Sequence, residues 1–287
     1  EGLPHLAGES PDTGPAEPSI DPEMVDELEK KIVELSQEVE VLQADQSASG
    51  SSLDVLTAQL SQEHGSLDVA KTLVEPELLE GLRYLVETAE PVLISGPCGA
   101  GKRFTAGLAH ALDPAEPGPM LTLDVVNYLT ESRYPDLDHV DPELFAAAED
   151  GALLVRAAQL LTAQQLKALI HRSKDRFRLY LCFDEPDPER RSPLESYPEI
   201  SEVLEHRELV LPPFRKRRGI HTVVFHHFAE AAAKRRRKEI LGISASAIEF
   251  LEAFEFRGNV TECRAMIESA VERTTSEVLD LEDFWQA

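Results

Sequence analysis

A glycine-rich turn between an apolar run and an amphipathic stretch has the most specific spacing in the sequence. The run PVLIS ends at Ser95, the turn is GPCGAGK, and the helical pattern RFTAGLAHAL follows it. Glycines at this spacing let backbone N–H groups curl around phosphate oxygens, and a helix start adds the positive end of its dipole. The terminal lysine would neutralise the outer phosphates of ATP or ADP. The predicted nucleotide-binding residues are Gly96, Pro97, Cys98, Gly99, Ala100, Gly101, Lys102 and Arg103.

Two observations bear on this phosphate loop, residues 96–102. Arg103 stands where the general motif has a Ser or Thr that ligates Mg²⁺. The alternative to a nucleotide site is a glycine-rich turn between a strand and a helix, with an incidental lysine. Because strand, loop and helix follow one another in the expected order, the sequence favours the nucleotide site.

Two carboxylates, Asp184 and Glu185, follow the apolar run at 178–183. An acid at the end of a buried strand holds Mg²⁺ in many P-loop enzymes. No catalytic residue is assigned, and Asp184 and Glu185 are kept as candidates. The segment DEPDPER is turn-like throughout, which favours the alternative that both carboxylates face solvent.

Short apolar runs alternate with amphipathic stretches along the part of the chain that would position these residues. Strands separated by helices indicate a parallel sheet with helices on both faces. From about residue 219 the strand signal disappears and the pattern is helical. We predict an α/β nucleotide-binding subdomain over residues 68–218 and a helical subdomain over residues 219–287. The predicted strands are Pro91–Ser95, Met120–Val125, Ala152–Val155, Arg178–Phe183 and Glu208–Leu211.

The N-terminal part of the chain has a different composition. Residues 1–22 are rich in Pro, Gly, Ser and acids, which predicts a disordered acidic tail. Within residues 23–46, β-branched residues alternate with Leu in steps of three and four over positions 25–42. This pattern is typical of a parallel two-stranded coiled coil, through which the chain would self-associate. A lone amphipathic helix is the alternative, and residues 47–67 are read as a linker.

The chain has 28 Lys and Arg against 53 Asp and Glu, a formal net charge of −25. Such a charge repels nucleic acid and anionic membranes, so direct DNA binding would need a local basic patch. RKRR at 215–218 and KRRRK at 234–238 are candidates, although a basic run on a helix is usually a solvated face. The 3 cysteines lie far apart, and no apolar run is long enough to span a membrane. We expect a cytoplasmic protein with no membrane or direct DNA contact.

Residues 68–287 resemble the AAA+ domain of sigma-54-dependent transcriptional activators, the bacterial enhancer-binding proteins. The segment LPPFRKRRGIHTVVFHHF at 211–228 is similar to the family's LPPLRERREDI junction. The segment at 243–274 is similar to the closing helices of the family's lid, which carry a WPGNVREL signature. The resemblance implies a P-loop AAA+ sheet with flanking helices, a helical lid over 219–287, bound ATP or ADP, and self-association through AAA+ faces.

The family's acidic strand, of the type GTLFLDE, corresponds to GALLVRA at 151–157. Arg156 and Ala157 therefore stand where two acids hold Mg²⁺ and polarise water. An arginine there repels Mg²⁺, so the resemblance argues against Mg²⁺ as a cofactor, and no residue is assigned as a metal ligand. By the same alignment, Asp184 falls where an Asn contacts the γ-phosphate.

Other functional positions of the family also carry different residues. The arginine fingers correspond to Tyr197 and Val203, and the lid arginine that senses the γ-phosphate corresponds to Thr261. The GAFTGA loop, which contacts the sigma factor, has no counterpart between residues 121 and 151. We also expect no helix-turn-helix DNA-binding domain. Losing an arginine finger typically costs on the order of 10³–10⁵ in the rate of phosphoryl transfer.

These features predict a degenerate AAA+ module that binds ATP or ADP but hydrolyses it poorly or not at all. It would act as a regulatory or scaffolding subunit in transcription control, because a nucleotide that prefers the assembled state shifts the population toward it. The alternative is a slow, genuine ATPase that uses Asp184 or Glu185 to remodel a protein partner. A third possibility is a scaffold that has lost its nucleotide affinity. The identity of the protein partner does not follow from the sequence.

Overall fold

The computed structural model describes residues 67–115, 118–126, 142–184, 194 and 197–285. All of these residues fall within one compact unit, residues 51–287. The predicted acidic tail, the predicted coiled coil at 25–42 and Glu185 lie outside the described residues. No helix in the described part of the chain is long and apolar enough to cross a membrane.

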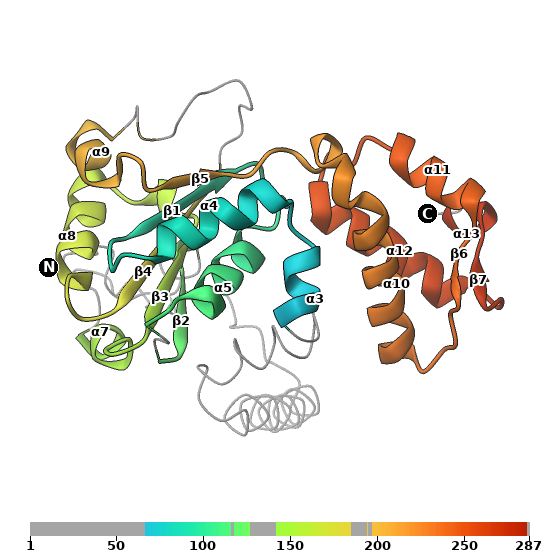
Figure 1. The fold of residues 1–287 in the computed structure, drawn as a ribbon, viewed down its shortest axis with the longest axis horizontal. Helices are drawn as coiled ribbons and strands as arrows, with labels where there is room; N and C mark the ends of the chain where they lie inside the picture. The colour runs from blue at the N-terminus through green and yellow to red at the C-terminus, as the bar shows by residue number, and fades with distance from the viewer. Residues whose placement is uncertain (1–66, 116–117, 127–141, 185–193, 195–196, 286–287) are drawn as a thin grey trace, which may run out of the picture. The chain divides into compact units, whose positions relative to one another are not determined.

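A five-stranded parallel sheet forms the centre of the α/β part, in the order β2-β3-β4-β1-β5 (Figure 1). Every predicted strand is present, and each end differs from the prediction by at most one residue. Both faces of β1 are buried along its whole length, which explains why a continuous apolar run marked it in the sequence. The strands are β1 (Val92–Gly96), β2 (Met120–Asp124), β3 (Ala152–Arg156), β4 (Arg178–Asp184) and β5 (Glu208–Val210).

Helices cover both faces of this sheet. Successive residues of a strand point to opposite faces, so Leu93 and Ile94 belong to two different apolar clusters. The cluster of Ile94 includes side chains of α3 (Leu67–Thr72), α4 (Pro76–Val86) and α5 (Lys102–Leu112). The cluster of Leu93 includes side chains of α7 (Pro142–Ala147), α8 (Ala163–Ser173) and α9 (Pro198–Leu204). The predicted α/β fold with a parallel sheet is therefore confirmed.

Residues 214–285 form a helical subdomain with its own apolar core. The rings of Phe214, Phe225 and Phe256 are buried together, and the centroids of Phe214 and Phe256 lie 5.7 Å apart. The same cluster includes Leu73 and contacts Phe104 of α5, so this core also touches the α/β part. The helices of the subdomain are η4 (Phe214–Lys216), η5 (Arg218–Ile220), α10 (His221–Arg236), α11 (Ala245–Ala253), α12 (Asn259–Arg273) and α13 (Leu281–Trp285).

The expectation that the chain is helical throughout after residue 219 is wrong at one place. The strands β6 (Gly242–Ile243) and β7 (Val278–Leu279) pair in parallel. The N–H of Ser244 also donates to the carbonyl of Leu279, so this pairing joins the start of α11 to the start of α13. Strands of two residues are too short to show an alternating pattern, so no periodicity in the sequence predicts them.

Candidate functional site

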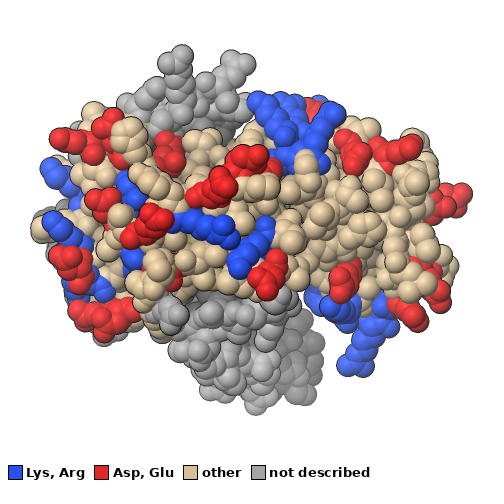
Figure 2. All heavy atoms as spheres, in the orientation of Figure 1, with Lys and Arg blue, Asp and Glu red and all other residues tan. Residues whose placement is uncertain are grey.

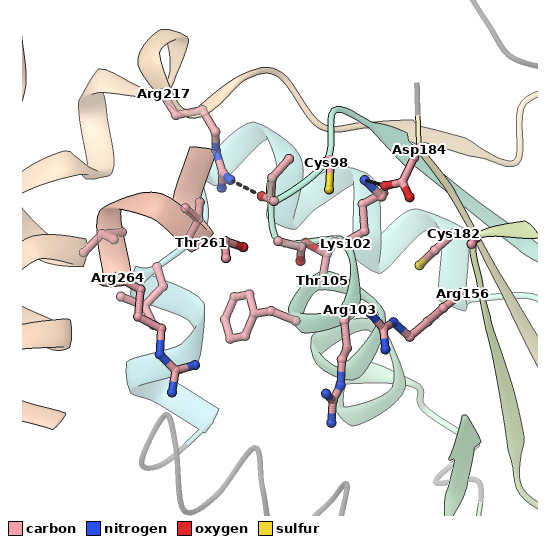
Figure 3. A pocket seen from close by; sticks show the side chains of 18 of the residues that line it. Cys98, Lys102, Arg103, Thr105, Arg156, Cys182, Asp184, Arg217, Thr261 and Arg264 are labelled. Atoms are coloured by element: carbon pink, nitrogen blue, oxygen red, sulfur yellow. Dashed lines mark hydrogen bonds and ion pairs between the residues drawn. The ribbon is translucent and has the colours of Figure 1, made fainter. Parts of the chain in front are cut away.

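A cavity of about 600 Å³ lies between the phosphate loop and the helical subdomain (Figure 3). Of the residues predicted to bind nucleotide, Cys98, Gly99, Ala100, Gly101, Lys102 and Arg103 line this cavity, whereas Gly96 and Pro97 do not. The opposite wall is largely apolar, and the floor at the sheet carries charged side chains. The apolar wall consists of Leu73, Ile220, Val224, Phe228 and Val260, and the charged side chains are those of Asp124, Arg156 and Asp184.

Two glycines allow the phosphate loop to take this path. Gly96 has a φ of 147°, and a Cβ at this position would lie 2.5 Å from the carbonyl oxygen of Leu211. Gly99 has a φ of 76°, and a Cβ there would lie 2.2 Å from the carbonyl oxygen of Gly258. Any larger residue would meet both backbone strain and a clash with main-chain atoms. These two positions therefore require glycine.

Three successive carbonyl oxygens of the phosphate loop accept hydrogen bonds from the segment that follows β5. A trans peptide places each N–H opposite the preceding carbonyl, so the N–H groups of Gly99 and Gly101 point away from these donors, whereas the N–H of Ala100 donates to the carbonyl of Pro97 at 3.2 Å. An array of N–H groups turned to one side is the geometry that binds anions. The pairs are Asn259 Nδ2 to Cys98 O at 2.8 Å, the Thr261 N–H to Gly99 O at 3.3 Å, and Arg217 Nη1 to Ala100 O at 3.1 Å.

Two of these donors are buried and held by other contacts. Asn259 is the first residue of α12, and its Oδ1 accepts a hydrogen bond from the N–H of Phe214 at 2.9 Å. Arg217 forms an ion pair with both carboxylate oxygens of Glu75, the residue before α4, with the shortest contact at 2.8 Å. A forked pair of this kind fixes orientation as well as charge. The loop, α4 and the helical subdomain are therefore joined through one arginine and one asparagine.

Lys102 occupies the position that the sequence predicted for contact with phosphates. It is the first residue of α5, and its side chain is 9% exposed. Its Nζ donates to the carbonyl oxygens of Gly96 and Pro97, each at 2.8 Å, and lies 2.6 Å from Oδ1 of Asp184. These three contacts hold the ammonium group at the mouth of the loop, where a phosphate oxygen would replace the carboxylate.

Asp184 lies in the cavity and not in a loop directed at solvent. Because β4 pairs with β1, Asp184 is the register partner of Gly96 at the start of the phosphate loop. The side chain of Gln159 fixes it further, since Gln159 Oε1 accepts from the N–H of Asp184 at 3.0 Å. The alternative that this carboxylate simply faces solvent is wrong, although 39% of the side chain remains exposed.

A second ion pair forms the floor of the cavity. Nη1 of Arg156, at the end of β3, lies 2.8 Å from Oδ2 of Asp124, its register partner on β2. Cys182 also faces the cavity, and burial raises the pKa of its thiol to about 12 against the opposing effect of Lys102. The floor thus combines two paired cations with a neutral thiol.

Of the three other positions that the family resemblance identified, only one lines the cavity. Thr261 lines the cavity, whereas Tyr197 and Val203 do not. The hydroxyl of Tyr197 donates to the carbonyl of Gln159 at 2.9 Å, and Val203 is half exposed on α9. Tyr197 therefore supports the turn that positions Asp184.

The two basic clusters lie apart, one over the segment between β5 and α10 and the other at the end of α10, at opposite edges of the view in Figure 2. Acidic side chains surround them. Arg235 and Arg236 lie 2.6 Å from Glu268 and Glu272 of α12, and Lys238 donates to the carbonyl of Glu272 at 2.7 Å. These cations therefore join α10 to α12.

Sequence reasoning missed several residues that build this site. Glu75, Arg217 and Asn259 are far from the loop along the chain, and only the fold brings them to it. Asp124 could have been found, because it lies next to the last residue of the predicted strand Met120–Val125, at the carboxyl edge of the sheet, where ligands bind in such folds. The sequence indicates Arg264 more weakly, because Arg264 lies one helical turn after Thr261, and it lines the same cavity.

Comparison with known proteins places these features in a class. Residues 215–287 match the model of the AAA+ ATPase lid domain. A parallel five-stranded sheet with a phosphate loop between β1 and α5, followed by this lid, defines an AAA+ P-loop module. The chain is related in sequence to sigma-54-dependent transcriptional regulators, which confirms the resemblance predicted above.

Two curated relatives illustrate that relationship. The transcriptional regulatory protein ZraR of Salmonella typhimurium is 24% identical over 227 residues, which cover 70% of this chain and 52% of ZraR. The regulatory protein AtoC of Escherichia coli is 24% identical over 217 residues, covering 67% of this chain and 47% of AtoC. The chain thus spans about half the length of the curated relatives it matches.

A solved structure shows the same fold. NtrX from Brucella abortus, crystallised in complex with ATP, matches with a TM-score of 0.59 and 15% sequence identity. The match covers 72% of this chain and 51% of NtrX. At this identity the match establishes the fold alone.

Proposed function

We propose that this AAA+ module binds ATP or ADP, hydrolyses it poorly or not at all, and acts as a regulatory or scaffolding subunit in transcription control. The observation that carries the proposal is the cavity at the phosphate loop, where Lys102 is in place but Arg156 ends β3 and Ala157 follows it. The first feature supports nucleotide binding, and the second removes the acids that hydrolysis requires. The ATP bound to NtrX supports the choice of ligand.

Different residues around the cavity would contact different parts of the nucleotide. The phosphate loop and Lys102 would hold the phosphates, while the apolar wall formed by Ile220, Val224 and Phe228 would cover the base. Because that wall belongs to the helical subdomain, a bound nucleotide contacts both parts of the module. A nucleotide that contacts both parts favours one arrangement of them and shifts the population toward it without hydrolysis.

The proposed partners follow from this regulatory role. Self-association would use residues 25–42, outside the described part, together with the AAA+ faces. A further protein partner would respond to the arrangement that the bound nucleotide favours. The curated relatives are named as transcriptional regulators, which supports a place in transcription control. The paired basic clusters and the net charge of −25 argue against direct DNA binding.

The test is a titration of a fluorescent ATP analogue into the protein, beside the variant Lys102→Ala. We expect micromolar binding that the variant loses and that Lys174→Ala, an exposed lysine outside the cavity, retains. Phosphate release with excess ATP should give a flat trace. Absence of binding to the unaltered protein would overturn the proposal and leave a scaffold without a nucleotide.

A second function is favoured by one observation, the carboxylate of Asp184 at 2.6 Å from Lys102 Nζ. In this alternative the module is a slow ATPase in which Asp184 polarises the attacking water and a protein partner is remodelled. Steady phosphate release that Asp184→Ala abolishes would support the ATPase. A flat trace for both proteins would reject it.

A further inference from the structure

We propose, on the basis of the nucleotide binding proposed above, that this site takes its nucleotide without a divalent cation. Lys102 and Arg156 supply the positive charge that Mg²⁺ supplies in most P-loop enzymes. The ligand class is therefore a metal-free nucleoside di- or triphosphate. The argument rests on which side chains occupy the positions around the phosphate loop and on how each is paired.

The positions that normally provide Mg²⁺ ligands do not fit that ion. In P-loop sites a hydroxyl after the loop lysine and an acid at a strand end hold Mg²⁺ together with phosphate oxygens. Here Arg103 follows Lys102, and Arg156 and Ala157 stand at the end of β3. No side chain at these positions offers an oxygen ligand, and two of them are cations. A divalent ion at this place would be repelled.

The two carboxylates in the cavity are already engaged. Asp124 lies 2.8 Å from the guanidinium of Arg156, and Asp184 lies 2.6 Å from the ammonium group of Lys102. Within the described residues, no group of three or more His, Cys, Asp and Glu is placed to hold a metal ion. As long as no nucleotide is bound, each carboxylate would have to leave its cation before it could ligate Mg²⁺.

Arg156 is suited to replace the ion. Its side chain is 46% exposed, lines the same cavity as Lys102, and extends from the sheet toward the phosphate loop (Figure 3). A guanidinium presents a planar fork of donors that matches two phosphate oxygens. Because an ion pair this exposed is weak, a phosphate can take the arginine from Asp124 at little cost.

The test measures the Kd of a fluorescent ATP analogue in EDTA and in millimolar Mg²⁺. Binding in EDTA should be at least as tight as binding in Mg²⁺. Binding weakened about tenfold or more by EDTA, equivalent to about 1.4 kcal/mol, would overturn the inference and leave the proposed function standing. Absence of binding in both buffers would overturn the proposed function itself.

Variants of Arg156 assign the effect to this side chain. Arg156→Gln should weaken binding in EDTA about tenfold, because a charge-assisted contact to phosphate is lost. Arg176→Gln is the matched control, since Arg176 is 41% exposed, pairs with Glu149 at 3.3 Å and lies outside the cavity. Unchanged binding of Arg156→Gln in EDTA would overturn the inference.

A further variant guards against a folding artefact. Arg156→Lys keeps the charge and should keep most of the binding in EDTA, and melting temperatures without nucleotide should agree among the three variants. If Arg156→Gln proves less stable, the comparison of Arg156→Lys with the unaltered protein decides: a lysine variant of normal stability that binds in Mg²⁺ but not in EDTA would overturn the inference.

Discussion

Nζ of Lys102 lies 2.6 Å from Oδ1 of Asp184, so the phosphate loop is closed by a carboxylate of its own chain. The contact follows from the sheet order, because β4 lies beside β1 and sets Asp184 opposite Gly96. A phosphate group that enters the loop must compete with this carboxylate for the lysine. Asp184 therefore lowers nucleotide affinity in the proposed binding site, whereas in an ATPase it would contribute to catalysis.

Asp184→Asn removes the competing charge while it keeps the shape of the side chain. We expect the affinity for a fluorescent ATP analogue to rise about fivefold, equivalent to about 1 kcal/mol, because a partly exposed ion pair is worth no more than this. Asp68→Asn is the control, since Asp68 pairs with Lys71 at 3.1 Å outside the cavity. Weaker binding of Asp184→Asn would contradict the role of an internal competitor.

Gly99→Ala should abolish nucleotide binding. The new Cβ would lie 2.2 Å from the carbonyl oxygen of Gly258, and the backbone at φ 76° is strained for any residue with a side chain. We expect the free energy of unfolding to fall by about 1–3 kcal/mol as the loop shifts. Gly219→Ala, where a Cβ meets nothing within 4 Å, should change neither property. Denaturant unfolding measures the free energy of unfolding, and titration of the fluorescent ATP analogue measures the affinity. Normal binding by Gly99→Ala would contradict the prediction, because it would show that the loop tolerates the displacement.

Asn259→Ala should separate the helical subdomain from the phosphate loop. The substitution leaves the N–H of Phe214 and the carbonyl of Cys98 without the partners that they have at 2.9 and 2.8 Å. Because Asn259 is buried, we expect unfolding in urea to become easier by about 2–3 kcal/mol. Thr222→Ala, which removes an exposed hydrogen bond to Glu252, should cost less than about 1 kcal/mol. Equal effects of the two substitutions would contradict the structural role of Asn259.

The elements that could be predicted from the sequence are those determined by neighbouring residues. The strand that ends at Gly96 is buried on both faces, so an unbroken apolar run marks it. The loop before Lys102 is recognisable because its glycines are needed within a few positions of one another. In both cases the physical requirement is local, and the structure agrees with the prediction.

The rest depends on residues that only the fold brings together. Glu75 and Arg217 are 142 positions apart, and Cys98 and Asn259 are 161 positions apart, so no local pattern links either pair. The turn-like residues after Asp184 predict a carboxylate that faces solvent, whereas the pairing of β4 with β1 directs it to Lys102. The strand β6 has only two residues, Gly242 and Ile243, which pair with two residues of β7, and a strand this short leaves no periodic signal.

His110 makes stability depend on pH. Burial lowers the pKa of this histidine below 6.5, with Arg178 adding to the effect and Asp113 opposing it. The unfolded chain therefore binds more protons than the folded one, so stability is lost as the pH falls through the unfolded value of about 6.5. Urea unfolding at about pH 5.5 and 7.5 should show this loss, and His110→Gln should reduce it. His206→Gln, at an exposed position, is the control and should show the same loss of stability between the two pH values as the unaltered protein. An equal loss in all three proteins would contradict the assignment to His110.

Cys98 provides a chemical probe of the proposed nucleotide site. It is exposed in the phosphate loop, whereas Cys182 and Cys263 are buried. Burial raises the pKa of the Cys182 thiol to about 12 and also raises the pKa of Cys263, so neither forms the reactive thiolate at neutral pH. A disulfide reagent should therefore modify Cys98 rapidly in the native protein and the other two thiols only on unfolding.

Bound nucleotide should protect this thiol. Saturating ATP covers the loop, so the labelling rate of Cys98 should fall about tenfold or more if at least nine-tenths of the sites are occupied. In Cys98→Ser the rapid phase should disappear, which identifies the reactive thiol, and in Lys102→Ala the rate should no longer respond to ATP. A rate that ATP leaves unchanged in the unaltered protein would place the nucleotide elsewhere or exclude it, because no ligand can occupy the phosphate loop and leave its exposed side chain equally accessible.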